Sequence, residues 1–154
     1  MTATSLDKAF FACAREVPDE SLLQRRDLDG VRVVIIRQEQ VVGGNTYLGD
    51  TYARHEFSGR LVCRFEWSPD SKFLVFTTSS SGGHSPWHFK TYVFSVADKT
   101  FRNLDDAIGS VTSPEFRFEA PDVLVVTVGN DEQKKQVRVS LPKGISEINP
   151  VEYH

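Results

Sequence analysis

Two short apolar runs constrain this chain more than any other feature. FLVFTT covers residues 73–78 and VLVVTV covers residues 123–128, and a Pro-Asp pair that favours a tight turn lies shortly before each run. Runs of this length, apolar at consecutive positions and rich in β-branched or aromatic residues, are typical of strands that are covered on both faces. We therefore expect a β-sheet with two buried faces at the centre of the fold.

The chain after residue 29 alternates between extended segments and turn residues. The expected strands, about eight, cover residues 31–36, 46–52, 61–67, 73–78, 91–96, 111–118, 123–128 and 136–141. No helix-length apolar periodicity separates them, so the parallel β-α-β pattern is absent. Eleven Phe residues against one Met also favour sheets over helices. The sequence predicts a mainly β, predominantly antiparallel fold.

The N-terminal segment has a different pattern. Its apolar residues recur at helical spacing, at Leu6, Phe10, Cys13 and Val17. Ser5 is a suitable N-cap and Pro18 ends the run. We predict one amphipathic helix within residues 1–26, laid against the β meanders of residues 29–148, in a single domain that spans residues 1–154.

Part of the chain resembles a known family. WSPDSKFLVFTT at 67–78 and TYVFSVADKTFRNL at 91–104 resemble the WD40-like repeats of TolB-type β-propellers, and residues 117–148 repeat the same order of turn, buried strand, loop and alternating strand. Ser71 stands where the family has a turn Gly, and the chain has room for three blades where propellers need about four or more. The resemblance implies blade-like antiparallel meanders in a small layered sheet stack or a partial propeller.

Charge and composition narrow the classes of function. The net charge of −3 argues against a nucleic-acid binder, which needs surplus Lys and Arg. No apolar run approaches the roughly 18 residues of a membrane span. No signal peptide is visible, and the compartment stays open: cytoplasmic as the sequence stands, or periplasmic if a leader has been removed. Cys13 and Cys63 match no zinc or redox motif, and we expect buried free thiols rather than a disulfide.

The most unusual segment is SSSGGHSPWHF at residues 79–89. It places an aromatic side chain between polar donors in a Gly-containing loop of a sheet, a composition that suits an interface. The residues that we expect to bind a partner are His84, Ser85, Trp87 and His88. The alternative is that Trp87 folds back over a sheet edge while the His residues face solvent.

The leading hypothesis for function is a non-catalytic protein-binding module, such as a bacterial accessory or inhibitor-type protein. The alternative is a small-ligand or metal-binding protein or an enzyme that uses the loop of His84, Trp87 and His88. We expect no cofactor, metal ligand or catalytic residue, because no zinc motif, phosphate loop or nucleophile elbow is present. Asp105 and Asp106 are interpreted as a turn or the cap of a short helix. A third option is an oligomer that completes its sheet stack by self-association.

Overall fold

The structure, a computed structural model, describes residues 1–17, 30–40, 46–58, 61–79, 88–129 and 132–151. Within these ranges the strands form three antiparallel sheets. The N-terminal sheet contains β1 (Thr2–Thr4), β2 (Phe10–Val17), β3 (Gly30–Gln40) and β4 (Thr46–Ser58). The central sheet contains β5 (Val62–Trp67), β6 (Phe73–Ser79), β7 (Phe89–Ser95) and β8 (Thr100–Asn103). The C-terminal sheet contains β9 (Arg117–Ala120), β10 (Val123–Val128) and β11 (Lys135–Ser140), and the two helices are α1 (Asp105–Ile108) and α2 (Leu141–Gly144).

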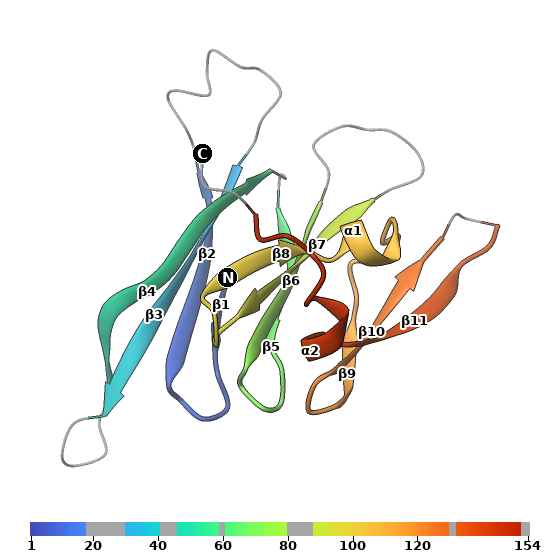
Figure 1. Cartoon of the computed structure of the whole chain (residues 1–154). Helices are drawn as coiled ribbons and strands as arrows, with labels where there is room; N and C mark the ends of the chain where they lie inside the picture. The colour runs from blue at the N-terminus through green and yellow to red at the C-terminus, as the bar shows by residue number, and fades with distance from the viewer. Residues whose placement is uncertain (18–29, 41–45, 59–60, 80–87, 130–131, 152–154) are drawn as a thin grey trace.

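Each sheet is a meander in which consecutive strands are neighbours. Figure 1 shows the N-terminal sheet in blue to teal on the left, the central sheet in green to yellow in the middle and the C-terminal sheet in orange on the right. The C-terminal segment, in red, runs from α2 back across the central sheet (Figure 1). The mainly β, antiparallel prediction is confirmed.

The central sheet is buried on both faces, as its sequence predicts. Leu74 and Phe76 belong to a cluster shared with the N-terminal sheet, and Phe73 and Val75 belong to one shared with the C-terminal sheet. Phe76 is fully buried and its ring packs against those of Phe57, Tyr92 and other aromatic residues. Because adjacent residues of a strand point to opposite faces, one run of apolar residues supplies both cores.

The predicted N-terminal amphipathic helix is wrong over residues 1–17, and the rest of the segment predicted for it, residues 18–26, lies outside the described residues. Ser5 to Phe10 forms a turn between β1 and β2, and β2 pairs with β3 along its whole length. Leu6, expected on the apolar stripe, is 69% exposed. The inner face of β2 instead follows a period of two, with Ala12 and Ala14 buried. A short apolar run fits both periods, and the backbone pairing offered by β3 decided between them.

Two turns of the chain have the same hydrogen bonds. In the turn before β2, the Ser5 hydroxyl donates to Asp7 and accepts from the Phe10 amide; in the turn before β6, Ser68 does the same with Asp70 and Phe73. The fourth residue of each turn, Lys8 or Ser71, has a φ of 62°. The turns also touch, because the Asp7 amide donates to the Ser71 hydroxyl over 3.0 Å.

The other predicted strands differ from the observed strands mainly in the residues at which they begin and end. The expected strand at 111–118 is the exception: Val111 forms only an isolated bridge with Val128, and β9 begins at Arg117. Pro114 lies between them and has no amide hydrogen for a sheet ladder. Both cysteines are free, but Cys63 is exposed and Cys13 is only half-buried, which corrects the expectation of buried thiols.

Candidate functional site

Most of the predicted binding loop lies outside the described residues. His84, Ser85 and Trp87 are among the residues 80–87 that the structure does not describe, so their role stays a prediction. His88 is described and is exposed immediately before β7. Ser79 and Phe89 are paired at the ends of β6 and β7, so the segment leaves the central sheet between two neighbouring strands.

The carboxylates of the second predicted feature lie in α1. Asp105 and Asp106 occupy the first turn of this short helix, which confirms the interpretation of a helical stretch. Among the described residues, no group of three or more His, Cys, Asp or Glu side chains could hold a metal ion. Asp105 is instead tied to the central sheet, because its carboxylate accepts the Thr91 amide hydrogen over 3.3 Å.

The environment of Asp105 raises the pKa of its carboxyl group. Burial raises the pKa of Asp105 to about 7, against the hydrogen bond from the Thr91 amide and the charge of Lys90, and the neighbouring charge of Asp106 adds to the rise. The helix is also held by backbone bonds, since the Leu104 amide donates to the Thr91 carbonyl and Leu104 is fully buried. α1 is therefore fixed on the central sheet through β7.

Among the described residues, the C-terminal sheet has three strands and each of the other two sheets has four. In the described part of the chain no strand pairs with β11 on the side away from β10. After β11 the chain enters α2, with Pro142 in its first turn, and does not turn back as a fourth strand. β11 therefore ends the sheet with a free edge.

The hydrogen bonding shows which backbone groups face this edge. The Leu141 amide donates to the Asp122 carbonyl directly opposite it, and bonded pairs alternate with non-bonded pairs in an antiparallel ladder. Residues 137 and 139 are therefore the ones that exchange bonds with β10. The amide and carbonyl groups of Gln136, Arg138 and Ser140 point outward and can pair with a further strand.

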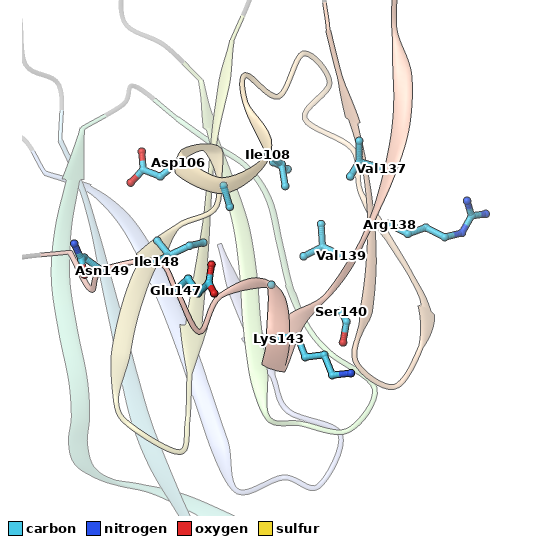
Figure 2. A pocket seen from close by; sticks show the side chains of 12 residues that line it. Asp106, Ile108, Val137, Arg138, Val139, Ser140, Lys143, Glu147, Ile148 and Asn149 are labelled. Carbon is cyan, nitrogen blue, oxygen red and sulfur yellow. The ribbon is translucent and has the colours of Figure 1, made fainter.

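A hollow of about 730 Å³ lies beside this edge. Its walls come from α1, β11, α2 and the segment at 147–149. Figure 2 shows Val137 and Val139 pointing from β11 toward Ile108 and Ile148, and Arg138 pointing the opposite way. The hollow has a mixed lining: Ile108, Val137, Val139 and Ile148 are apolar, and Asp106, Arg138, Lys143 and Glu147 are charged.

The wall opposite α1 is held by close packing and by the C-terminal segment. A Cβ atom added to Gly144 would lie 2.4 Å from a methyl carbon of Val139, so α2 approaches β11 as closely as glycine permits. The Ile148 carbonyl accepts a bond from the Arg102 side chain, and the Val151 amide donates to the Phe101 carbonyl over 2.7 Å. These contacts tie the segment to β8 and keep the hollow open.

The other face of β11 carries charged side chains. Arg138 binds both carboxylate oxygens of Glu119, which also contacts Arg117. The three side chains lie over Val125, which is only 2% exposed. This face is therefore suited to water, whereas the face toward the hollow is apolar.

Sequence reasoning missed this site. The hollow depends on the absence of a fourth strand and on the position of α1, and neither is visible as a motif. One sequence signal for the missing fourth strand is Pro142, which directly follows the alternating run at 136–141. Proline has no amide hydrogen to donate to a sheet ladder, so it disfavours a further hairpin strand at this point.

Comparisons with known proteins identify no family for this chain. No protein-family model matches the chain, and no curated protein is significantly similar to it in sequence. Within the described residues, no helix has the length and apolar character needed to cross a membrane. Any functional assignment therefore depends on the geometry of the site itself.

Proposed function

We propose that this domain is a protein-binding module that accepts one extended segment of a partner protein as a fourth strand beside β11. The observation that carries the proposal is the free edge of β11 beside a hollow whose lining includes Ile108, Val137 and Ile148. Among the described residues this sheet has three strands, whereas each of the other two has four. Strand addition of this kind gains affinity from backbone hydrogen bonds and specificity from pockets for alternate side chains.

The other long edges of the fold suit strand addition less well. The pairing of β4 with β3 is interrupted by two register shifts, and irregular edges resist pairing with a new strand. The edge of β8 already receives the Val151 amide at the Phe101 carbonyl. The pairing of β11 with β10 has no such shift over six consecutive residues.

The hollow defines the chemistry of the partner segment. A strand beside β11 would place every second side chain on the face of Val137 and Val139, against Ile108 and Ile148. Apolar side chains at alternating positions fit this face, because Ile108 and Val137 are only partly buried. Covering their remaining apolar surface is favourable by about 25 cal/mol per Å². The partner is thus an extended segment with apolar residues at every second position.

The resemblance to the WD40-like repeats of TolB-type propellers supports the same class of function. The consecutive four-stranded meanders and the shared Ser-x-Asp turns are consistent with blade-like units, and loops and edges of such units commonly contact partner proteins. The role of the loop of His84, Trp87 and His88, as a second contact or as a ligand site, remains part of the proposal.

The test uses a substitution that blocks the edge and spares the fold. Ser140 has a φ of −73° and its side chain makes no capping bond, so proline fits its backbone and removes one outward amide hydrogen. Peptides are selected from a displayed library of random dodecamers on the wild-type domain. We expect Ser140→Pro to bind them roughly tenfold more weakly, and Ser140→Ala to bind them as the wild type does.

A second measurement separates strand addition from simple contact with the hollow. N-methylation of single peptide amides is expected to abolish binding at every second residue, because only alternate amides face β11. Equal binding by Ser140→Pro and Ser140→Ala, or an N-methyl pattern without the period of two, contradicts the proposal. Selection that enriches no peptide also contradicts it.

A further inference from the structure

We infer that the partner strand beside β11 carries acidic side chains on the face that points away from the hollow, with Arg138 as the residue that binds them. The inference rests on the proposed function, because it concerns the same partner strand. It adds the charge of the alternate partner residues, whereas the hollow accounts only for the apolar ones. The partner is then an extended segment that is apolar on one face and acidic on the other.

The free edge carries basic side chains and no acidic one. Residues 134–143 run along this edge into α2, and their charged residues are Lys134, Lys135, Arg138 and Lys143. All four residues are exposed. Lys135 and Lys143 form no ion pair within the described part of the chain. A strand that pairs with this edge therefore meets a positive potential, which favours an acidic segment.

The two faces of the edge differ in the charge that they favour. On the hollow side, an acidic partner residue would lie near the carboxylates of Asp106 and Glu147, which line the hollow. On the other side, where Arg138 points in Figure 2, the side chains of β11 alternate as Gln136, Arg138 and Ser140. Arg138 is the charged residue among these three. Acidic partner residues therefore fit the face of Arg138 and not the hollow.

The guanidinium group of Arg138 is held in place and still has donors to offer. Its Nε donates to Oε2 of Glu119 over 2.6 Å, and its Nη2 donates to Oε1 over 2.9 Å. Its Nη1 has no hydrogen-bond partner among the described residues, and the side chain is 59% exposed. Because a guanidinium group has five N–H donors, Nη1 can bind a second carboxylate while the bonds to Glu119 stay in place.

Glu119 does not cancel the positive charge at the position of the partner. Its carboxylate is shared by Arg138 and Arg117, so the three side chains together are positively charged. Glu119 lies on β9, and β10 separates β9 from β11. Three steps of about 4.8 Å, or roughly 14 Å, separate β9 from a strand beside β11, which exceeds the Debye length of about 8 Å. Arg138 is one step away, so its charge dominates there.

The β11 edge of a second copy of this chain does not supply such a strand. β11 has the sequence KQVRVS, which contains no acidic residue. Antiparallel pairing of two β11 edges would set Arg138 opposite another Arg138 or an uncharged residue, Gln136 or Ser140. Basic side chains on an edge strand disfavour self-pairing of this kind. The charges of the edge thus select against a second copy and for an acidic segment.

The test is a selection from a displayed library of dodecamers with valine, isoleucine or leucine at odd positions and glutamate, lysine or threonine at even positions. The library is selected on the wild-type domain and on Arg138→Glu. We expect the wild type to enrich glutamate and the variant to enrich lysine at even positions. In the tightest peptide selected on the wild type, lysine in place of the central glutamate is expected to weaken binding roughly tenfold, because a favourable charge pair becomes an unfavourable one.

Arg117→Gln is the matched control, because Arg117 also binds Glu119 but lies on β9. This variant is expected to keep the preference for glutamate. Thermal unfolding is measured first, and Arg138→Gln, expected to lose the preference, replaces Arg138→Glu if the latter does not fold.

The outcomes separate this inference from the proposed function. Peptides that bind with the N-methyl period of two but without a preference for glutamate overturn the inference alone. Enrichment of glutamate by Arg138→Glu, or an equal loss of the preference in Arg117→Gln, also overturns the inference alone. A library from which no peptide is enriched overturns both.

Discussion

The central sheet and the C-terminal sheet are built from similar runs of apolar residues but differ in what covers them. The central sheet has four strands and apolar clusters on both faces. The C-terminal sheet has three strands, one apolar face, one face covered by Arg117, Glu119 and Arg138, and a free edge at β11. The comparison shows that the first sheet is enclosed by apolar packing, whereas the second leaves the outer side of β11 unpaired within the described residues.

The contrast follows from two local features of the chain. After β7 the turn containing Asp98 and Thr100 leads into β8, with the Thr100 hydroxyl donating to the Asp98 carboxylate. After β11, α2 begins at once and the chain leaves the sheet. The first connection therefore leads into the fourth strand of the central sheet. The second leaves the position beside β11 without a strand in the described part of the chain.

The largest expected effect lies in the central sheet. Phe76→Ala removes a fully buried ring and is expected to lower the free energy of unfolding by about 3–5 kcal/mol. Val126→Ala, in the C-terminal sheet, is expected to cost about 2 kcal/mol. Urea denaturation measures both. Equal losses in the free energy of unfolding would show that the two sheets contribute alike to stability, and would contradict the difference described between them.

Proline substitutions test the difference between a paired strand and a free edge. Val93 is paired with Val75 on one side and Arg102 on the other, so Val93→Pro is expected to cost about 3 kcal/mol or more. Ser140→Pro is expected to cost less than about 1 kcal/mol, because the lost amide hydrogen faces outward. The midpoint of chemical denaturation distinguishes the two variants. A large loss for Ser140→Pro would mean that this amide already has a partner.

The third prediction concerns Asp105, which joins α1 to the central sheet. Its pKa of about 7 in the folded chain exceeds the ordinary value of 3.8, so the folded state retains a proton that the unfolded state has lost. Stability from this group therefore falls as pH rises from about 4 to 7 and stays low above that.

Asp105→Asn is expected to remove this loss. The variant should unfold a few degrees above the wild type at pH 8, by about 2–4 °C for each kcal/mol gained, and show little difference near pH 4. Asp106→Asn, on the exposed side of α1, is the comparison variant and is expected to change the pH dependence in the same direction but much less, because the charge of Asp106 is the smallest contribution to the raised pKa of Asp105. Thermal unfolding followed by circular dichroism measures the shift. An unchanged pH dependence in Asp105→Asn would contradict the assignment.

The last prediction concerns the two equivalent turns. Ser5→Ala and Ser68→Ala each leave the amide of a Phe without its acceptor, and both serines are almost fully buried. Each is expected to cost about 1–2 kcal/mol. Ser146→Ala, at an exposed serine, serves as the control with a change below about 0.5 kcal/mol. Unequal losses of stability in Ser5→Ala and Ser68→Ala would show that the two turns share their geometry but not their contribution to stability.

Much of the fold was predictable from sequence. The runs at 73–78 and 123–128 are strands, and the first is covered on both faces, because alternation and burial are local consequences of side-chain chemistry. The first two strands, β1 and β2, were not predicted, since the spacing of Phe10 and Cys13 fits a helix equally well, whereas β3 and β4 were. The shared Ser-x-Asp-x-x-Phe spacing at residues 5 and 68 was a usable signal for the repeated turn.

The candidate site was predictable only in part. The sequence indicates a loop at 79–89 with unusual composition, and its role stays a prediction. It gives no sign of the hollow beside β11, whose walls come from segments as far apart as Asp106 and Glu147. Their proximity depends on how α1 and the C-terminal segment pack, which no local pattern expresses.

The sequence by itself determined that the chain forms antiparallel strands, where its most buried strands lie and which turns join them, because these depend on the spacing of apolar and turn residues along the chain. Tertiary structure alone decided that, among the described residues, the outer edge of β11 has no neighbouring strand, and how the three sheets pack against one another. Those outcomes depend on long-range competition for backbone hydrogen bonds and buried surface, and only the assembled sheets settle it.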